Sequence, residues 1–149
     1  MKSLDDLTPV VCRILVRLVV RDGVDRPVMV DLRYDGADPY AVFMTFHLGA
    51  DVSVRWVIGR DLLLNGQHGL TGVGDVQVWP SQHPYVSKVC IALRPNWNRE
   101  AAVVTASARA LDAFLRQTLA MVPAGTEERH LDMDGIVHQL LSGPGTPHR

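Results

Sequence analysis

Two glycines separated by one residue, with an acid after them, make Gly72-Val73-Gly74-Asp75 look like a loop that cradles phosphates. A dinucleotide-binding fingerprint needs a third glycine and opens a helix, but Gln77 stands at that position and an alternating strand pattern follows. A P-loop would also need Lys-Ser or Lys-Thr after its last glycine, and neither is present there. We therefore expect these glycines to turn the chain where it enters a strand.

The segment GRDLLLNG, residues 59–66, is partly similar to the catalytic loop of protein kinases. It has two residues between Leu62 and Asn65 where the kinase motif has three, it lacks the preceding histidine, and the chain contains no DFG motif. Asp61 is therefore interpreted as an acid near the N-terminal end of a short helix, where the helix dipole stabilises a carboxylate.

Other residues that could perform catalysis or bind a metal are scattered. The six histidines include no pair at i, i+4 spacing. Cys12 and Cys90 lie in apolar runs and form no CxxC or Cys/His spacing, and no serine lies in a GxSxG motif. The sequence predicts no catalytic set, no metal site and no cofactor, and hence a protein that is not an enzyme.

One basic stripe is present in the run from Val10 to Val20, VVCRILVRLVV. Its dense β-branching favours a strand over a helix. One face of that strand carries Arg13, Arg17 and Arg21 together with Val11, Leu15 and Val19. The arginines could follow a nucleic-acid backbone or could pair with acids on the next strand, for which Asp31 is a candidate. The apolar residues of this face are candidates for an oligomer surface.

The stripe belongs to a series of predicted strands. They cover residues 10–20, 27–34, 40–48, 52–58, 74–80, 85–93 and 100–105, and the first four form an antiparallel meander with Val52, Val54, Trp56 and Ile58 pointing inward. A short helical stretch is expected at residues 60–66, a long helix at about 106–122, and a short final helix capped by Asp132. The fold class is α+β, with antiparallel β-sheets of about seven strands.

Composition sets the limits of the function. The chain has 149 residues with a formal net charge of -1 at pH 7, which fits one globular domain and disfavours a basic nucleic-acid binder. No signal-peptide core and no membrane-length apolar run is visible, so a cytoplasmic protein is expected. We assign residues 8–141 to one domain and residues 1–7 and 142–149 to flexible termini.

An aromatic residue in the predicted loop RPNWN, residues 94–98, is a candidate partner anchor. Trp97 lies between two asparagines and is expected to be exposed, and tryptophan is enriched in binding hot spots. Arg94 and Arg99 flank it and are included in the predicted contact. The alternative is that Trp97 folds back on its own domain.

Several stretches together resemble the SsgA-like proteins of sporulating actinomycetes. They are LRYDGADPYAVFMTFHLGADVSVRWVIGRDLLLNG (residues 32–66), TGVGDVQVWPS (71–81), VCIAL (89–93), ARALDAFLRQT (108–118) and VPAGTEERHLDMD (122–134). The resemblance covers residues 8–141. The loop LRPNWNREAAV is bulkier and more basic than the corresponding loop of the family, and the tail SGPGTPHR is additional.

This resemblance implies a non-enzymatic adaptor or regulator of sporulation-specific cell division. Members of the family act at division septa, and one member brings the tubulin-like protein FtsZ to future septum sites. The implied fold is similar to the "whirly" single-stranded nucleic-acid binders, and the implied assembly is a homotrimer. Implied partners are FtsZ or another SsgA-like protein, with the septal membrane reached only through them. The alternative function is a whirly-like regulator that binds single-stranded nucleic acid, which the near-neutral charge disfavours.

Overall fold

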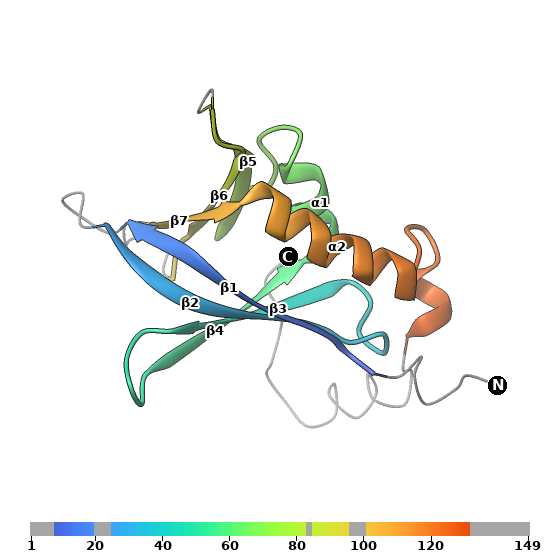
Figure 1. The fold of residues 1–149 in the computed structure, drawn as a ribbon. Helices are drawn as coiled ribbons and strands as arrows, with labels where there is room; N and C mark the ends of the chain where they lie inside the picture. Colours follow the sequence, from blue (N-terminus) through green and yellow to red (C-terminus); the bar gives the residue numbers. More distant parts are fainter. Residues whose placement is uncertain (1–7, 20–24, 83–84, 96–100, 132–149) are drawn as a thin grey trace.

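The computed structural model describes residues 8–19, 25–82, 85–95 and 101–131. These residues form seven strands and three helical segments (Figure 1). The strands are β1 (Val10–Val19), β2 (Asp25–Tyr34), β3 (Ala41–His47), β4 (Ser53–Gly59), β5 (Val76–Pro80), β6 (Lys88–Leu93) and β7 (Ala102–Ser107). The helices are α1 (Arg60–Gly66), α2 (Ala108–Met121) and the 3-10 helix η3 (Glu127–His130). The predicted α+β class with about seven antiparallel strands is confirmed.

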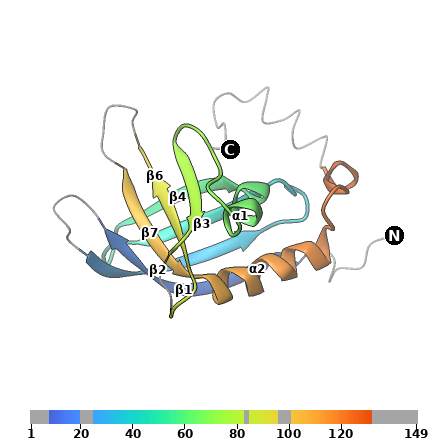
Figure 2. The same ribbon diagram turned by 90° about the horizontal axis from the view of Figure 1, so that it is seen from above.

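All seven strands belong to one antiparallel sheet with the order β4-β3-β2-β1-β7-β6-β5. The meander predicted for the first four strands is confirmed, because each pairs with its neighbour in sequence. The pairing of β1 with β7, in which Arg17 faces Thr105 and Val19 faces Val103, was not predicted. This long-range pairing joins the two meanders into a single curled sheet (Figures 1 and 2).

The core lies between the inner face of the sheet and α2. The inward residues of the strands include Val30, Leu32 and Ile91, and they pack with Phe114 and Leu115 of α2. These residues are at most 1% exposed, so α2 has the amphipathic character that the sequence predicted. The α2 helix begins where the hydroxyl oxygen of Ser107 accepts a hydrogen bond from the Ala110 N–H at 3.2 Å.

Helix α1 closes the curl between the two edge strands. It follows β4 directly and contacts both β4 and β5, which lie at opposite ends of the strand order. A side chain on Gly66 would collide with the Val78 side chain of β5, so only glycine allows α1 to pack this closely. Asp61 lies in the first turn of α1, as expected from the sequence.

The glycines that resemble a phosphate loop turn the chain, as predicted. Gly72 and Gly74 adopt positive φ angles of 102° and 100°, which favour glycine. They allow Thr71 to pair with Val78, with backbone N–H to carbonyl distances of 2.8 and 2.9 Å, just before the chain runs into β5. A Cβ on Gly72 would also lie 2.5 Å from the carbonyl oxygen of Val76.

The structure differs from the predicted elements at the β3–β4 turn and after α2. Val52 and Val54 were expected to point into the core, but they are 56% and 41% exposed. The β3–β4 turn projects beyond α1 and α2, so neither of these helices covers that end of the inner face (Figure 1). The η3 helix was not predicted, and the final helix expected after Asp132 lies outside the described residues, as do residues 1–7 and 142–149.

Candidate interaction surface

The face of β1–β4 that points away from α2 presents side chains in three rows that cross the strands. The register places Leu15, Met29, His47 and Ser53 in one row, Arg13, Asp31, Thr45 and Arg55 in the next, and Val11, Arg33, Phe43 and Val57 in the third. We call these twelve residues the outer face. Strand alternation predicted the β1 part of this surface, and the pairing register adds the other three strands.

Apolar side chains of the outer face are unusually exposed. Val11 is 62% exposed, Leu15 is 63% exposed and Met29 is 38% exposed. Leu15 and Met29 lie directly opposite each other on neighbouring strands. The prediction that Val11 and Leu15 lie away from the core is confirmed, whereas Val19 is partly buried. Val11 lies across the row of Arg13 and Asp31 from the Leu15–Met29 pair. These exposed apolar side chains make the outer face a candidate surface for contact with another molecule.

A network of three charged or titratable side chains runs beside this apolar group. The Arg13 Nε and Nη2 donate to the two carboxylate oxygens of Asp31 at 2.7 and 3.0 Å. The His47 Nε2 lies 2.7 Å from Asp31 Oδ2, and because an ionised carboxylate can only accept, this nitrogen carries the proton. The hydrogen bonds from Arg13 and then His47 lower the pKa of Asp31 to about 2. Asp31, the predicted candidate partner of the arginine stripe, therefore does pair with the stripe, and its partner is Arg13.

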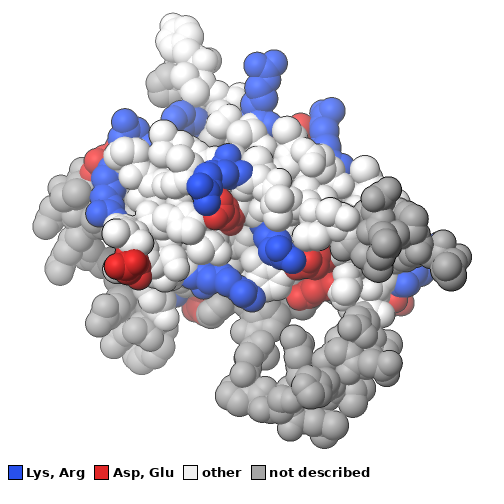
Figure 3. Space-filling model, turned by 60° about the horizontal axis from the view of Figure 1, so that its bottom comes forward, with Lys and Arg blue, Asp and Glu red and all other residues white. Residues whose placement is uncertain are grey.

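Two more arginines of this side of the sheet are paired with acids. Arg17 lies 3.0 Å from Asp25, and Arg33 lies 3.1 Å from Asp35. Figure 3 shows cationic and anionic groups side by side on this side of the molecule, without a continuous cationic field. A nucleic-acid backbone needs several unpaired cations, so these pairs argue against the nucleic-acid interpretation of the stripe. Arg21 lies outside the described residues.

An open hollow of about 560 Å³ lies over part of the outer face. Its lining residues are Val11, Cys12, Arg13, Asp31, Leu32, Arg33, Asp35, Phe43, Thr45 and Arg55. The Arg55 guanidinium stands 4.4 Å from the centre of the Phe43 ring, which is a cation–π contact. The sequence predicted that Arg55 points away from the core. It did not predict the contacts of Phe43 with Arg55 and of His47 with Asp31, because these depend on how three strands pair.

The second predicted contact lies after β6. Arg94 is exposed, and its backbone N–H donates to the Asp75 carbonyl at 2.9 Å. It lines a smaller hollow of about 210 Å³ together with Gly74, Gln77 and Ala101. Trp97 and Arg99 lie outside the described residues, so their predicted part in partner binding stays a prediction.

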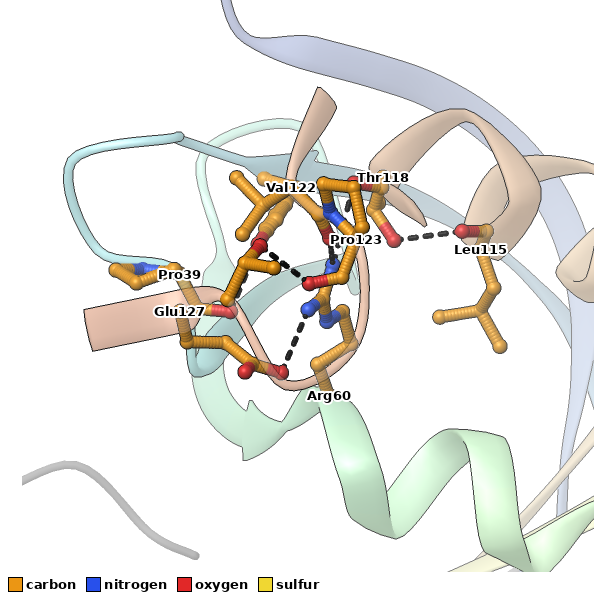
Figure 4. Close-up of polar contacts among 9 residues, drawn as sticks. Pro39, Arg60, Leu115, Thr118, Val122, Pro123 and Glu127 are labelled. Atoms are coloured by element: carbon orange, nitrogen blue, oxygen red, sulfur yellow. Dashed lines mark hydrogen bonds and ion pairs between the residues drawn. The ribbon is translucent and has the colours of Figure 1, made fainter. Parts of the chain in front are cut away.

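A buried arginine on the inner side was missed at the sequence level. Arg60, at the start of α1, is 1% exposed and forms an ion pair of 2.9 Å with Glu127 of η3. Its Nη1 donates to the carbonyls of Thr118 at 3.2 Å and Val122 at 2.7 Å, at the C-terminal end of α2 (Figure 4). The Thr118 carbonyl also accepts a hydrogen bond from the Val122 N–H at 2.8 Å, so the guanidinium adds a second donor there. It also pairs the Val122 carbonyl just after the helix, and it connects α1, α2 and η3.

The surroundings of this pair fix its charge state. The backbone N–H groups of Glu127 itself and of Gly125, together with Arg60, keep the pKa of Glu127 below its usual value, against the opposing effect of burial. Burial raises the pKa of Tyr34 to about 12, and its ring lies 5.0 Å from the Arg60 guanidinium. The Tyr34 hydroxyl donates to the Pro39 carbonyl at 2.8 Å. Both terminal nitrogens of Arg60 and the Tyr34 hydroxyl have partners within the chain, whereas Arg60 Nε is buried without one among the described residues. Because these partners belong to the end of α2, to η3 and to the loop after β2, we assign the cluster to the fold.

Comparison with known proteins identifies the family. The family described as "Streptomyces sporulation and cell division protein, SsgA" matches residues 28–127. This chain belongs to the SsgA family. Among curated relatives, the sporulation-specific cell division protein SsgB of Streptomyces coelicolor is 50% identical over 135 residues, which are 91% of this chain and 97% of that protein. SsgB of Salinispora tropica is 41% identical over 131 residues, 86% of this chain and 90% of the relative.

Solved structures of the SsgA family share the fold. The structure of an SsgA-like sporulation-specific cell division protein from Thermobifida fusca superposes with a TM-score of 0.80 at 36% identity, covering 93% of this chain and 98% of the other. A second solved structure carries the description "Mutations in SsgB correlate to longitudinal cell division during sporulation of Streptomyces coelicolor". It superposes with a TM-score of 0.76 at 51% identity. It covers 84% of this chain and 97% of the other. The chain thus has a role in sporulation-specific cell division.

The SsgA family is not a known enzyme family, and its description indicates no catalytic function. Within the described ranges, no group of three or more His, Cys, Asp or Glu side chains is arranged to hold a metal ion. In that same part of the chain, no helix combines the length and the apolar character needed to cross a membrane.

Proposed function

We propose that this protein is a non-enzymatic adaptor of sporulation-specific cell division. It assembles with copies of itself, as a homotrimer, and binds either FtsZ or another SsgA-like protein at the division septum. It acts from the cytoplasm and reaches the septal membrane only through these partners. Its task is to select the septum site, either by recruiting FtsZ or by positioning the protein that does so.

One observation carries this proposal, which is the exposed apolar group of the outer face. Three apolar side chains of the outer face are exposed in the single chain, although the inner face of the same sheet packs into a buried core. They are Val11, Leu15 and Met29. Beside them lies the network of Arg13, Asp31 and His47, whose polar groups can orient a partner. Apolar area supplies affinity and the charged rim supplies specificity, which is the usual division of roles at a protein interface.

Self-assembly would strengthen weak contacts with a polymer. Three copies held together present three equal surfaces, and the second and third contacts then form at a high effective concentration. A trimer would therefore hold a filament of the division protein far longer than one chain could. A variant that is folded and monomeric, yet recruits FtsZ as well as the parent protein, would contradict this mechanism.

Light scattering, on the protein alone and then mixed with FtsZ, tests the proposal. We expect a mass of about 49 kDa, three chains of 16.4 kDa, and a further increase when FtsZ is added. Leu15→Glu should reduce one or both of these masses without unfolding the chain, because Leu15 lies outside the core. The matched control is Val73→Glu, since Val73 is 89% exposed on a loop before β5.

Each outcome of this measurement has a distinct meaning. A trimer that leaves FtsZ unchanged would indicate that the protein positions another SsgA-like protein and does not recruit FtsZ itself. A monomer would remove the avidity argument for this chain. If Leu15→Glu and Val73→Glu both behave like the parent protein, the outer face is not the interaction surface.

A further inference from the structure

The hollow on the outer face has an excess of one positive charge. Three of its lining residues are arginines, Arg13, Arg33 and Arg55, and two are carboxylates, Asp31 and Asp35. Arg13 pairs with Asp31 and Arg33 pairs with Asp35, so two of the three guanidinium groups are already neutralised. Arg55 has no carboxylate within ion-pair distance in the described part of the chain. The hollow therefore offers one guanidinium to an incoming anion.

The position of Arg55 suits the recognition of a carboxylate. Its guanidinium is held 4.4 Å from the centre of the Phe43 ring, which restricts the side chain without using its N–H donors. A guanidinium fixed in this way can donate two parallel hydrogen bonds to one carboxylate. Arg55 and Arg13 occupy opposite ends of the same row, separated by Thr45 and Asp31, so the free charge lies at the edge of the paired network.

Apolar side chains border the same hollow. Val11 and Phe43 belong to its lining, whereas Leu15 and Met29 lie outside the hollow, beyond the row of Arg13 and Asp31. Phe43 lies on the strand next to Arg55, and Val11 lies three strands away, roughly 14 Å at the spacing of paired strands. A ligand that fits must therefore combine a negative charge with apolar groups spread over that distance. The volume of about 560 Å³ is in the range that suits a few residues of an extended peptide.

We propose that this hollow binds an acidic segment of a protein partner. The segment is an extended peptide that crosses the strands, places one Asp or Glu carboxylate on Arg55, and places apolar side chains against Phe43 and Val11 on either side of Arg33. The inference deepens the proposed function and rests on it, because it specifies which part of a partner the adaptor would hold. One carboxylate matches the guanidinium of Arg55, whereas a run of phosphates would bring further negative charges against Asp31 and Asp35, which repel them. The charge count therefore favours a peptide with a single acidic contact over a nucleic acid.

A synthetic probe tests the inference without any knowledge of the natural partner. The probe is a peptide of alternating leucine and aspartate, and its control is the same peptide with asparagine in place of aspartate. Both are titrated into the full-length protein while the backbone amide signals are followed by NMR. We expect the acidic peptide to shift the signals of Val11, Arg33, Phe43 and Arg55, and we expect the asparagine peptide to bind more weakly.

Charge reversal at one position provides the decisive comparison. Arg55→Glu should weaken binding of the acidic peptide by about tenfold or more, since it removes an attraction and adds a repulsion. Arg55→Lys should retain part of the affinity. The matched control is Arg109→Glu, an equal charge change at an exposed position of α2 on the other side of the sheet, which should leave binding unchanged.

Three results would overturn the inference. They are equal binding of the acidic and asparagine peptides, equal weakening by Arg55→Glu and Arg109→Glu, and displacement of the peptide by a single-stranded oligonucleotide that binds more tightly.

Co-sedimentation with FtsZ separates this inference from the proposed function. Specific peptide binding without any effect on FtsZ or on an SsgA-like protein supports the hollow as a peptide site and contradicts the adaptor role.

Discussion

Arginine–carboxylate pairs occur on both sides of the sheet, and the two sets differ in their surroundings. Arg60 and Glu127 are buried, and the arginine also binds two carbonyls at the end of α2. Arg13 and Asp31 have a shorter separation, 2.7 Å, but their side chains are 63% and 38% exposed. Distance alone therefore does not show what an ion pair contributes. Burial makes the first pair part of the fold, whereas exposure leaves the second available for recognition.

The same division applies to the apolar residues. The inner face has a continuous core, while the outer face keeps Val11, Leu15 and Met29 in contact with water. Stability is thus concentrated on one side of the sheet and interaction chemistry on the other. The predictions below test this division, beginning with the largest expected change.

Arg60→Met should produce the largest loss of stability, about 3–5 kcal/mol in the free energy of unfolding. It leaves the buried Glu127 carboxylate without its cation and removes the donor from the carbonyls of Thr118 and Val122. Urea denaturation measures the loss. The double variant with Glu127→Gln should recover part of it, and a double variant less stable than Arg60→Met would contradict the assignment.

Leu115→Ala and Leu15→Ala compare the two faces with the same chemical change. Leu115 is fully buried, so its truncation should cost about 2–5 kcal/mol, whereas truncation of the exposed Leu15 should stay within about 0.5 kcal/mol. Thermal unfolding measures both variants. A loss at Leu15 that approaches the loss at Leu115 would show that the outer face belongs to the core of an obligate assembly.

Gly66→Ala tests the closure of the sheet by α1. The added methyl group would overlap the Val78 side chain, so we expect a loss of about 1–3 kcal/mol. The control is Gly69→Ala, because a Cβ there meets nothing within 4 Å. In a double-mutant cycle with Val78→Gly, which also removes the Cβ that the new methyl group would overlap, the two changes should cost less together than the sum of the single losses. Strict additivity would argue against the contact.

The smallest effect is expected for Arg13→Gln, which should raise the pKa of Asp31 from about 2 toward its ordinary value of 3.8. Because the folded-state pKa is lowered, the contribution of Asp31 to stability is present above pH 4 and is lost as the pH falls toward 2. An NMR titration of the side-chain carboxyl measures this change. An unchanged midpoint in the variant would mean that His47 alone maintains the shift.

The local parts of the fold could be predicted from the sequence. Strand alternation has a period of two, so it identified the exposed side of β1 and made Asp31 a candidate partner of the arginines on that side. The segment around Gly72 and Gly74 lacks the lysine of a P-loop and the third glycine of a dinucleotide-binding fingerprint. These two differences were enough to assign a turn there. Each of these predictions depends on residues that are neighbours in sequence or on adjacent strands.

Long-range features could not be obtained in this way. Arg60 and Glu127 are 67 residues apart, and nothing in the pattern around Arg60 distinguishes a buried arginine from a surface one. The expected burial of Val52 and Val54 was wrong, although Val54 lies on the inner face opposite Phe46, because alternation gives the side of a strand but not how far the covering helices extend. The grouping of Phe43 and Arg55 with Val11 requires the register of four strands.

The pairing of β1 with β7 determines when the sheet can be completed during synthesis on the ribosome. β1 ends at Val19, but its second neighbour does not begin until Ala102. The first four strands can pair as they emerge, while one side of β1 keeps unpaired backbone groups for most of translation. We therefore expect a partly formed sheet in which one edge of β1 stays unpaired until β7 leaves the ribosomal exit tunnel. During that interval the nascent chain would depend most on chaperones.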